Sequence, residues 1–110
     1  MVDLLNPLVV DSVKQRNNVL TKTQTPTTVS IDFTSTLNVG VLDSVSIFYK
    51  GIPPNTGFGS FATETHANVP VMWSLSEPYG SRDWWPCKNG LDDKPDSIDI
   101  IITNPVAYKG

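Results

Sequence analysis

The stretch Thr28-Val29-Ser30-Ile31-Asp32-Phe33 alternates between polar and apolar residues, and Ser44-Val45-Ser46-Ile47-Phe48-Tyr49 repeats the pattern. A period of two is typical of a β-strand that buries only one of its faces. Both stretches are therefore predicted to be strands. The residues predicted to face a core are Val29, Ile31, Phe33, Val45, Ile47 and Tyr49.

Further strands are predicted on both sides of these two. Each is a short run rich in β-branched or apolar residues, and turn formers such as Asn17-Asn18 and Asn104-Pro105 separate or end them. The predicted strands cover residues 8–13, 19–23, 69–75 and 96–103, and the pattern is strongest in the last. No apolar residues recur at helical spacing for three turns. The sequence therefore predicts an all-β fold, either an antiparallel β-sandwich or a saddle-like curved sheet.

Residues 50–68 follow neither a strand nor a helix period. Gly51, Pro53, Pro54, Gly57 and Gly59 fall within this segment. We expect a long loop here, and long loops in compact domains are usually functional or form interfaces.

Composition narrows the possible partners. The 110 residues suffice for one domain, and the net charge is −3 with no run of Lys or Arg. Binding to phosphate backbones or to anionic lipid needs clustered cations, so neither nucleic acid nor membrane is an expected partner.

Catalytic residue types are scarce. The chain has one histidine, His66, and one cysteine, Cys87, which cannot form an internal disulfide or a structural zinc site. A His66/Cys87 dyad is permitted by the sequence, but an exposed loop histidine and a small buried thiol are the favoured interpretation. The compartment stays open, a secreted or periplasmic parent protein included.

Two other groups of residues allow alternative functions. The chain has three tryptophans, Trp73, Trp84 and Trp85. They suit the binding surface of a carbohydrate- or protein-binding module, but we favour a role as anchors of a core or of a domain interface. Carboxylates at Asp92, Asp93, Asp96 and Asp99 permit an independent hydrolase. Because they flank Lys94 in a polar segment, a solvated loop is the expectation.

One stretch has a more specific meaning. This stretch is Ser76-Glu77-Pro78-Tyr79-Gly80-Ser81-Arg82-Asp83-Trp84-Trp85-Pro86-Cys87, and it is followed by Asp93-Lys94-Pro95 and a strand ending at Pro105. Together these residues resemble the N-terminal domain of family M1 aminopeptidases. Upstream, Phe48-Tyr49-Lys50-Gly51 and Gly57-Phe58 look like that family's strand end and following loop. The closest resemblance is to the bacterial branch with Trp-Trp-Pro-Cys-Lys, and it spans residues 9–108.

The resemblance implies that residues 1–110 are a non-catalytic β-domain, truncated at both ends. Its partner would be its own catalytic domain, which carries the zinc and a His-Glu-x-x-His motif absent from this chain. Glu77 matches the acidic position that binds the free α-amino group of a peptide N-terminus. The chain alone is then expected to hold no metal and to be inactive. The segment from Lys88 to Pro95 departs from the family pattern, with Lys94 the counterpart of the family's lysine.

Overall fold

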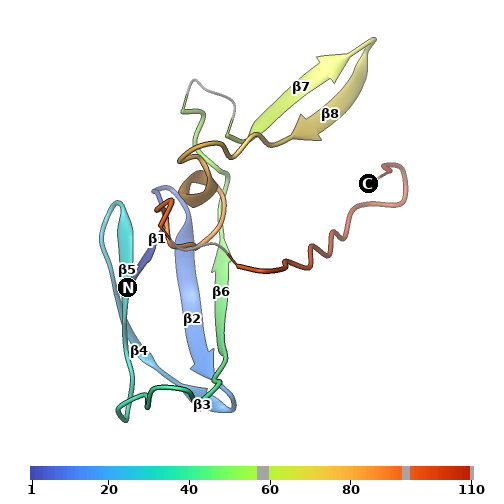
Figure 1. The fold of residues 1–110 in the computed structure, drawn as a ribbon. Coiled ribbons are helices and arrows are strands. Elements are labelled where there is room, and N and C mark those ends of the chain that lie inside the picture. Colours follow the sequence, from blue (N-terminus) through green and yellow to red (C-terminus); the bar gives the residue numbers. More distant parts are fainter. Residues whose placement is uncertain (57–59, 93–94, 110) are drawn as a thin grey trace.

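The computed structural model describes residues 1–56, 60–92 and 95–109, and these form strands with one short 3-10 helix (Figure 1). The elements are β1 (Val2–Asp3), β2 (Val9–Gln15), β3 (Asn18–Val19), β4 (Thr21–Gln24), β5 (Thr28–Asp32), β6 (Val45–Lys50), β7 (Ala62–His66), β8 (Val69–Trp73) and η1 (Ser81–Asp83). Within the described residues, no helix is long and apolar enough to cross a membrane.

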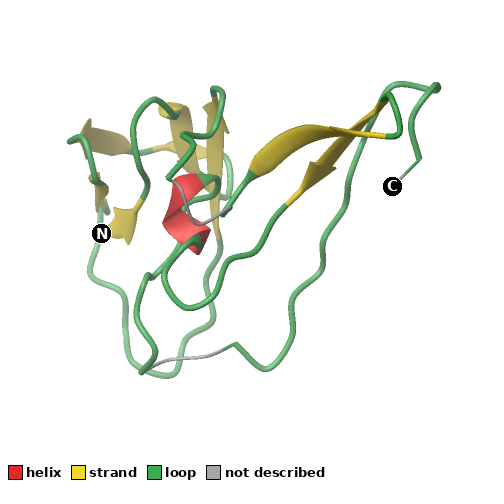
Figure 2. Cartoon of the chain, turned by 90° about the horizontal axis from the view of Figure 1, so that it is seen from above, coloured by secondary structure: helices red, strands yellow, loops and turns green. Residues whose placement is uncertain are grey.

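The strands form three antiparallel sheets, in the orders β1-β5-β4, β3-β2-β6 and β7-β8. The predicted all-β, antiparallel fold is therefore confirmed. Figures 1 and 2 show the β7-β8 hairpin projecting from the two three-stranded sheets.

One small core joins the two three-stranded sheets. Its buried members come from β2, β5 and the segments beside them: Leu4, Leu8, Val10, Val13, Leu20 and Val29. Val10 and Val13 are three residues apart, yet both are buried. A register shift between Val10 and Ser12 explains this, because an extra residue in a strand reverses the alternation of its side chains.

The side chain of Gln24 connects the two sheets. Its Nε2 donates a hydrogen bond to the Leu8 carbonyl at 2.7 Å, and its Oε1 accepts one from the Val10 amide at 3.0 Å. Gln24 ends β4, whereas Val10 belongs to β2. The Gln24 amide therefore bonds one backbone group of β2 and one directly before it.

Gln24→Ala is expected to lower the free energy of unfolding by about 1–2 kcal/mol. The substitution leaves a partly buried carbonyl and amide without partners, and such groups are costly to leave unsatisfied. Chemical denaturation followed by tryptophan fluorescence measures the change. Thr23→Ala, at an exposed position of the same strand, is the control; an equal loss in both variants would contradict the role of Gln24.

Residues 96–103, predicted as a strong strand, do not form one: this prediction was wrong. The segment has no assigned secondary structure, and Ile101 is 92% exposed. Figures 1 and 2 show it running away from the sheets. A strand needs a neighbour to satisfy its backbone hydrogen bonds, and within the described ranges none lies beside it.

Two of the predicted core residues were also wrong. Phe33 lies just beyond the end of β5 and is exposed, and Val45 begins β6 and is exposed. Val29 is fully buried, and Ile31, Ile47 and Tyr49 pack against the core as predicted. The alternation was correct, but the core is too short to cover the strand ends.

Residues 50–68 are not one loop, because β7 occupies Ala62–His66 and pairs with β8. The turn of this hairpin has positive φ at both central residues, Ala67 (49°) and Asn68 (64°). Two positive φ values are typical of the tight turns that join hairpin strands. Alanine is a poor signal for such a turn, and the mostly polar β7 sequence shows no apolar alternation.

Candidate functional site

Residues 76–87, here called the Glu77 loop, form an ordered turn. The Gly80 amide donates to the Ser76 carbonyl at 2.9 Å, which closes the turn around Glu77 and Pro78. The indole Nε1 of Trp84 donates to the Ser76 hydroxyl oxygen at 3.0 Å. The peptide bond between Glu77 and Pro78 is cis. Ser76 thus accepts hydrogen bonds from both Gly80 and Trp84.

The rest of the protein fixes this loop at several points. The Tyr49 hydroxyl, on β6, donates to the Trp84 carbonyl at 3.0 Å. The Leu5 amide donates to the Arg82 carbonyl at 2.9 Å. Asp3 and Cys87 exchange backbone hydrogen bonds of 2.7 and 3.1 Å, which ties β1 to the loop. The loop is held by the N-terminal segment on one side and by β6 on the other.

The loop itself contains a buried carboxylate. Asp83 is 4% exposed and accepts a hydrogen bond from the Thr56 hydroxyl at 2.7 Å. The Ser60 hydroxyl, also buried, lies 3.4 Å from the same Thr56 oxygen. This arrangement anchors the 3-10 helix to residues 56 and 60. Asp83 therefore has a structural partner already.

Glu77 is in a different situation. It is exposed, and among the residues that the structure describes it has neither an ion pair nor a side-chain hydrogen bond. It lines a shallow hollow of about 240 Å³ whose other lining residues are Leu5, Thr56, Ser60, Pro78, Tyr79, Gly80, Arg82 and Asp83. Glu77 therefore has a fixed backbone and an acidic side chain that makes no ion pair or side-chain hydrogen bond within the described residues.

Sequence reasoning singled out Glu77 but missed the residues that support it. Thr56 and Ser60 belong to a segment without motif or period, and nothing in the sequence paired Asp83 with them. Of these, Asp83 offered a signal, because it follows Gly-Ser-Arg directly after the Glu-Pro turn, as an acid in the first turn of a short helix.

Cys87 lies in the loop as a half-buried thiol. Burial, aided by the nearby Asp3 carboxylate, raises its pKa from 9.0 to about 11. A thiol with this pKa is protonated at neutral pH and is a poor nucleophile. His66 lies at the tip of the β7-β8 hairpin, whereas Cys87 pairs with β1, so the fold gives no support to a dyad of the two.

Alkylation of Cys87 by iodoacetamide is expected to be roughly 100-fold slower at pH 8 in the folded chain than in denaturant, because only the thiolate reacts. The pKa is raised by folding. The protonated Cys87 thiol therefore makes its full contribution to the free energy of unfolding below pH 9, and this contribution is lost as the pH rises toward 11. The pH profile of the alkylation rate measures this. A midpoint near 9 in the native state would contradict it.

The acidic cluster considered for a hydrolase is not assembled. Asp92 pairs with Lys88 at 3.2 Å, and hydrogen bonds from its own backbone amide and from Lys88 lower its pKa. Asp96 and Asp99 lie on the exposed extended segment, while Asp93 and Lys94, like Gly57 and Phe58, lie outside the described residues. In the part of the chain described, no three potential metal ligands of the His, Cys, Asp or Glu type are grouped.

The tryptophans do not form one flat platform. Trp84 and Trp85 are half-buried, with ring centres 5.8 Å apart and planes inclined by 34°. The ring centres of Phe61 and Trp84 are 6.0 Å apart. Trp73 is on a different element, at the end of β8. Buried atoms without a hydrogen-bond partner in the described structure are Trp85 Nε1 and Arg82 Nε.

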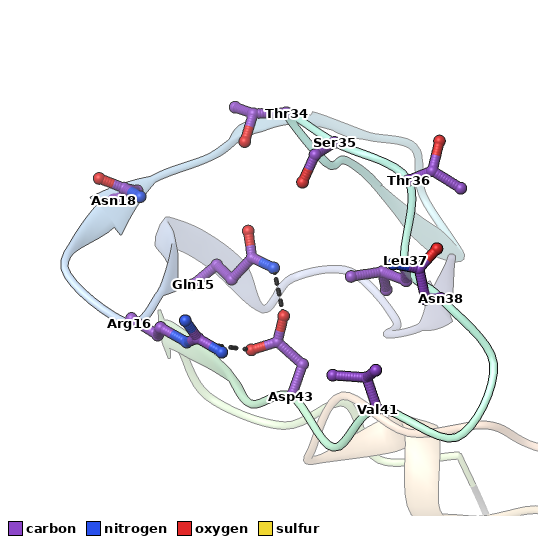
Figure 3. Close-up of a pocket in the computed structure, with 10 residues that line it drawn as sticks. All are labelled: Gln15, Arg16, Asn18, Thr34, Ser35, Thr36, Leu37, Asn38, Val41 and Asp43. Carbon is purple, nitrogen blue, oxygen red and sulfur yellow. Dashed lines mark hydrogen bonds and ion pairs between the residues drawn. The ribbon is translucent and has the colours of Figure 1, made fainter.

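A second hollow of about 270 Å³ lies at the other end of β2 (Figure 3). Its one carboxylate, Asp43, accepts hydrogen bonds from the Ser44 amide and from Gln15, and it lies 3.6 Å from Arg16. These bonds, chiefly that from Ser44, lower the pKa of Asp43. The carboxylate is thus already paired within the fold, and it orders residues 34–43 against the β2-β3 turn.

Comparison with known proteins does not add to this geometry. No protein-family model, curated protein or solved structure matches the chain. Any function must therefore be inferred from the Glu77 loop and its surroundings.

Proposed function

We propose that the chain is the non-catalytic N-terminal β-domain of a family M1 zinc aminopeptidase, and that Glu77 binds the α-amino group of the substrate. The observation that carries the proposal is the state of Glu77. Its carboxylate is exposed and unpaired within the described structure, at the rim of a hollow, on a loop whose backbone is fixed.

The chemistry of this side chain suits the role. A carboxylate facing an ammonium group forms a charge-assisted hydrogen bond, which is stronger than a neutral one. Because the loop is held by Tyr49, Leu5 and Asp3, the backbone that carries Glu77 keeps a fixed position relative to the sheets. A fixed anchor at the substrate terminus sets how far the chain reaches into a neighbouring active site. That distance selection would make the enzyme an exopeptidase.

The catalytic zinc is not assigned to this chain. The described residues offer no grouped ligands for it, so it would be held by the catalytic domain of the parent enzyme. The domain interface would include the half-buried Trp84 and Trp85.

The first test is to read the gene downstream of residue 110 and to assay the encoded protein. A His-Glu-x-x-His motif, with hydrolysis of aminoacyl-arylamides that stops when the α-amino group is acetylated, would support the proposal. Turnover by residues 1–110 alone would contradict it. Titration with oligosaccharides separates the alternative binding-module function, because a sugar on Trp84 or Trp85 would shift their fluorescence.

A further inference from the structure

We propose that residues 96–103 add as a fourth strand to the free edge of β6 in a second copy of the chain, so that two copies exchange these segments. Two features that the fold leaves unpartnered carry the inference. One is the extended segment; the other is β6, which pairs only with β2 in the described structure. The inference does not depend on the proposed aminopeptidase role.

The segment has the composition of a strand that is buried. Ile98, Ile100 and Ile102 share one face by period two, and Ile101 lies on the other with Asp99. All four isoleucines are exposed. A run of β-branched residues left unpaired pairs readily with another sheet edge. Asn104-Pro105 ends the run, since proline has no amide hydrogen to donate.

The free edge of β6 complements this pattern. Ile47 and Tyr49 pack against the core, while Phe48 lies on the outer face and is exposed. The sheets of this protein are all antiparallel, and antiparallel pairing is the more stable per residue. In one antiparallel register, Ile100 lies opposite Ile47, and Ile98 lies opposite Tyr49. The isoleucines of one face then extend the small core.

Charge supports the same register. It places Asp99 opposite Phe48 on the outer face. Lys14 lies over the Phe48 ring at 5.4 Å, and Lys50 is the next residue of β6 on that face. An aspartate at this position would therefore lie near Lys14 and near Lys50, which also forms an ion pair with Asp11 at 3.1 Å, and opposite charges across strands are favourable. A shift by one residue would instead turn Ile98, Ile100 and Ile102 to the outer face beside the lysines.

A second copy is the occupant that the structure favours. In its own chain the segment runs away from β6, as Figures 1 and 2 show. Reciprocal exchange gives each copy one donated and one accepted strand, which closes a twofold dimer in which both β6 edges are paired.

Light scattering during size exclusion tests the dimer directly. The chain is expected to elute with twice the mass of one copy at high concentration. Ile100→Lys should abolish the dimer, whereas Val106→Lys, at an exposed position beyond Pro105, should leave it intact. A monomer at every concentration would overturn the proposal, as would the same result for both variants.

Cross-linking tests the register. In a Cys87→Ser background, one variant carries Ser46→Cys and another Ile101→Cys, positions that lie opposite each other in this register. Mild oxidation should give a disulfide-linked dimer only when the two variants are mixed. A cross-link within either variant alone, or none in the mixture, would rule out this pairing.

Discussion

If the chain belongs to the aminopeptidase that we propose, replacing Glu77 with alanine is expected to lower kcat/KM of that enzyme by roughly 10- to 1,000-fold toward peptides with a free N-terminus. The loss of a charge-assisted contact to an ammonium costs roughly 1.5–4 kcal/mol, and a contact kept into the transition state reduces kcat/KM by the corresponding factor. The fold should stay intact, because the Glu77 side chain is exposed and makes no ion pair or hydrogen bond within the described residues. Steady-state kinetics with aminoacyl-arylamides measures the effect.

Two further variants make the result specific. Glu77→Gln keeps the shape and removes the charge, so it should lose most of the same activity. Glu64→Gln, an exposed glutamate on β7, should have no effect. Unchanged kcat/KM in Glu77→Ala would remove this residue from the substrate site.

The second large effect is expected at Gly80. This residue is buried, and a Cβ added to it would lie 2.4 Å from the Ser60 hydroxyl oxygen and 3.2 Å from the Leu75 carbonyl oxygen. Gly80→Ala therefore forces the turn away from Ser60, and such overpacking costs about 1–3 kcal/mol. For a domain of this size, each kcal/mol lowers the melting temperature by about 4–8 °C. Thermal unfolding followed by circular dichroism measures the change.

Gly90→Ala is the matched control. There an added Cβ would be close to Asp92 alone, an exposed side chain that can rotate away. The control should melt within about 2 °C of the native chain, since surface substitutions usually change stability by less than 0.5 kcal/mol. If Gly80→Ala melts with the control, the close approach to Ser60 is not a constraint. In the parent enzyme, Gly80→Ala should also lower kcat/KM, because the same displacement moves Glu77.

Two of the stretches that sequence reasoning located correctly, residues 8–13 and 28–33, overlap β2 and β5, whose Val10, Val13 and Val29 face the core between the two three-stranded sheets. The segment 96–103 also has a strong strand pattern and yet is no strand. The alternation of side chains predicts which residues a strand would bury. Whether the strand forms depends on a neighbouring strand to pair with, and the alternation does not describe that neighbour.

The candidate site was predictable only in its exposed part. Glu77 was identified through a resemblance carried by a short block of residues. The supporting contacts, such as Thr56 to Asp83 and Tyr49 to the Trp84 carbonyl, join segments about 27 and 35 positions apart. Local sequence rules do not reach across such separations, since they describe neighbours within a few residues.

The backbone hydrogen bonds between Asp3 and Cys87 affect the order in which parts of the protein fold during synthesis. During synthesis the N-terminal strand leaves the ribosome long before its partner at position 87. Closing so long a loop is entropically costly and gives the contact a high sequence separation, which slows its formation. The two sheets can assemble once β6 has emerged, whereas the Glu77 loop must wait. The loop that carries Glu77, the proposed substrate anchor, would thus become ordered after the two three-stranded sheets on the translating chain.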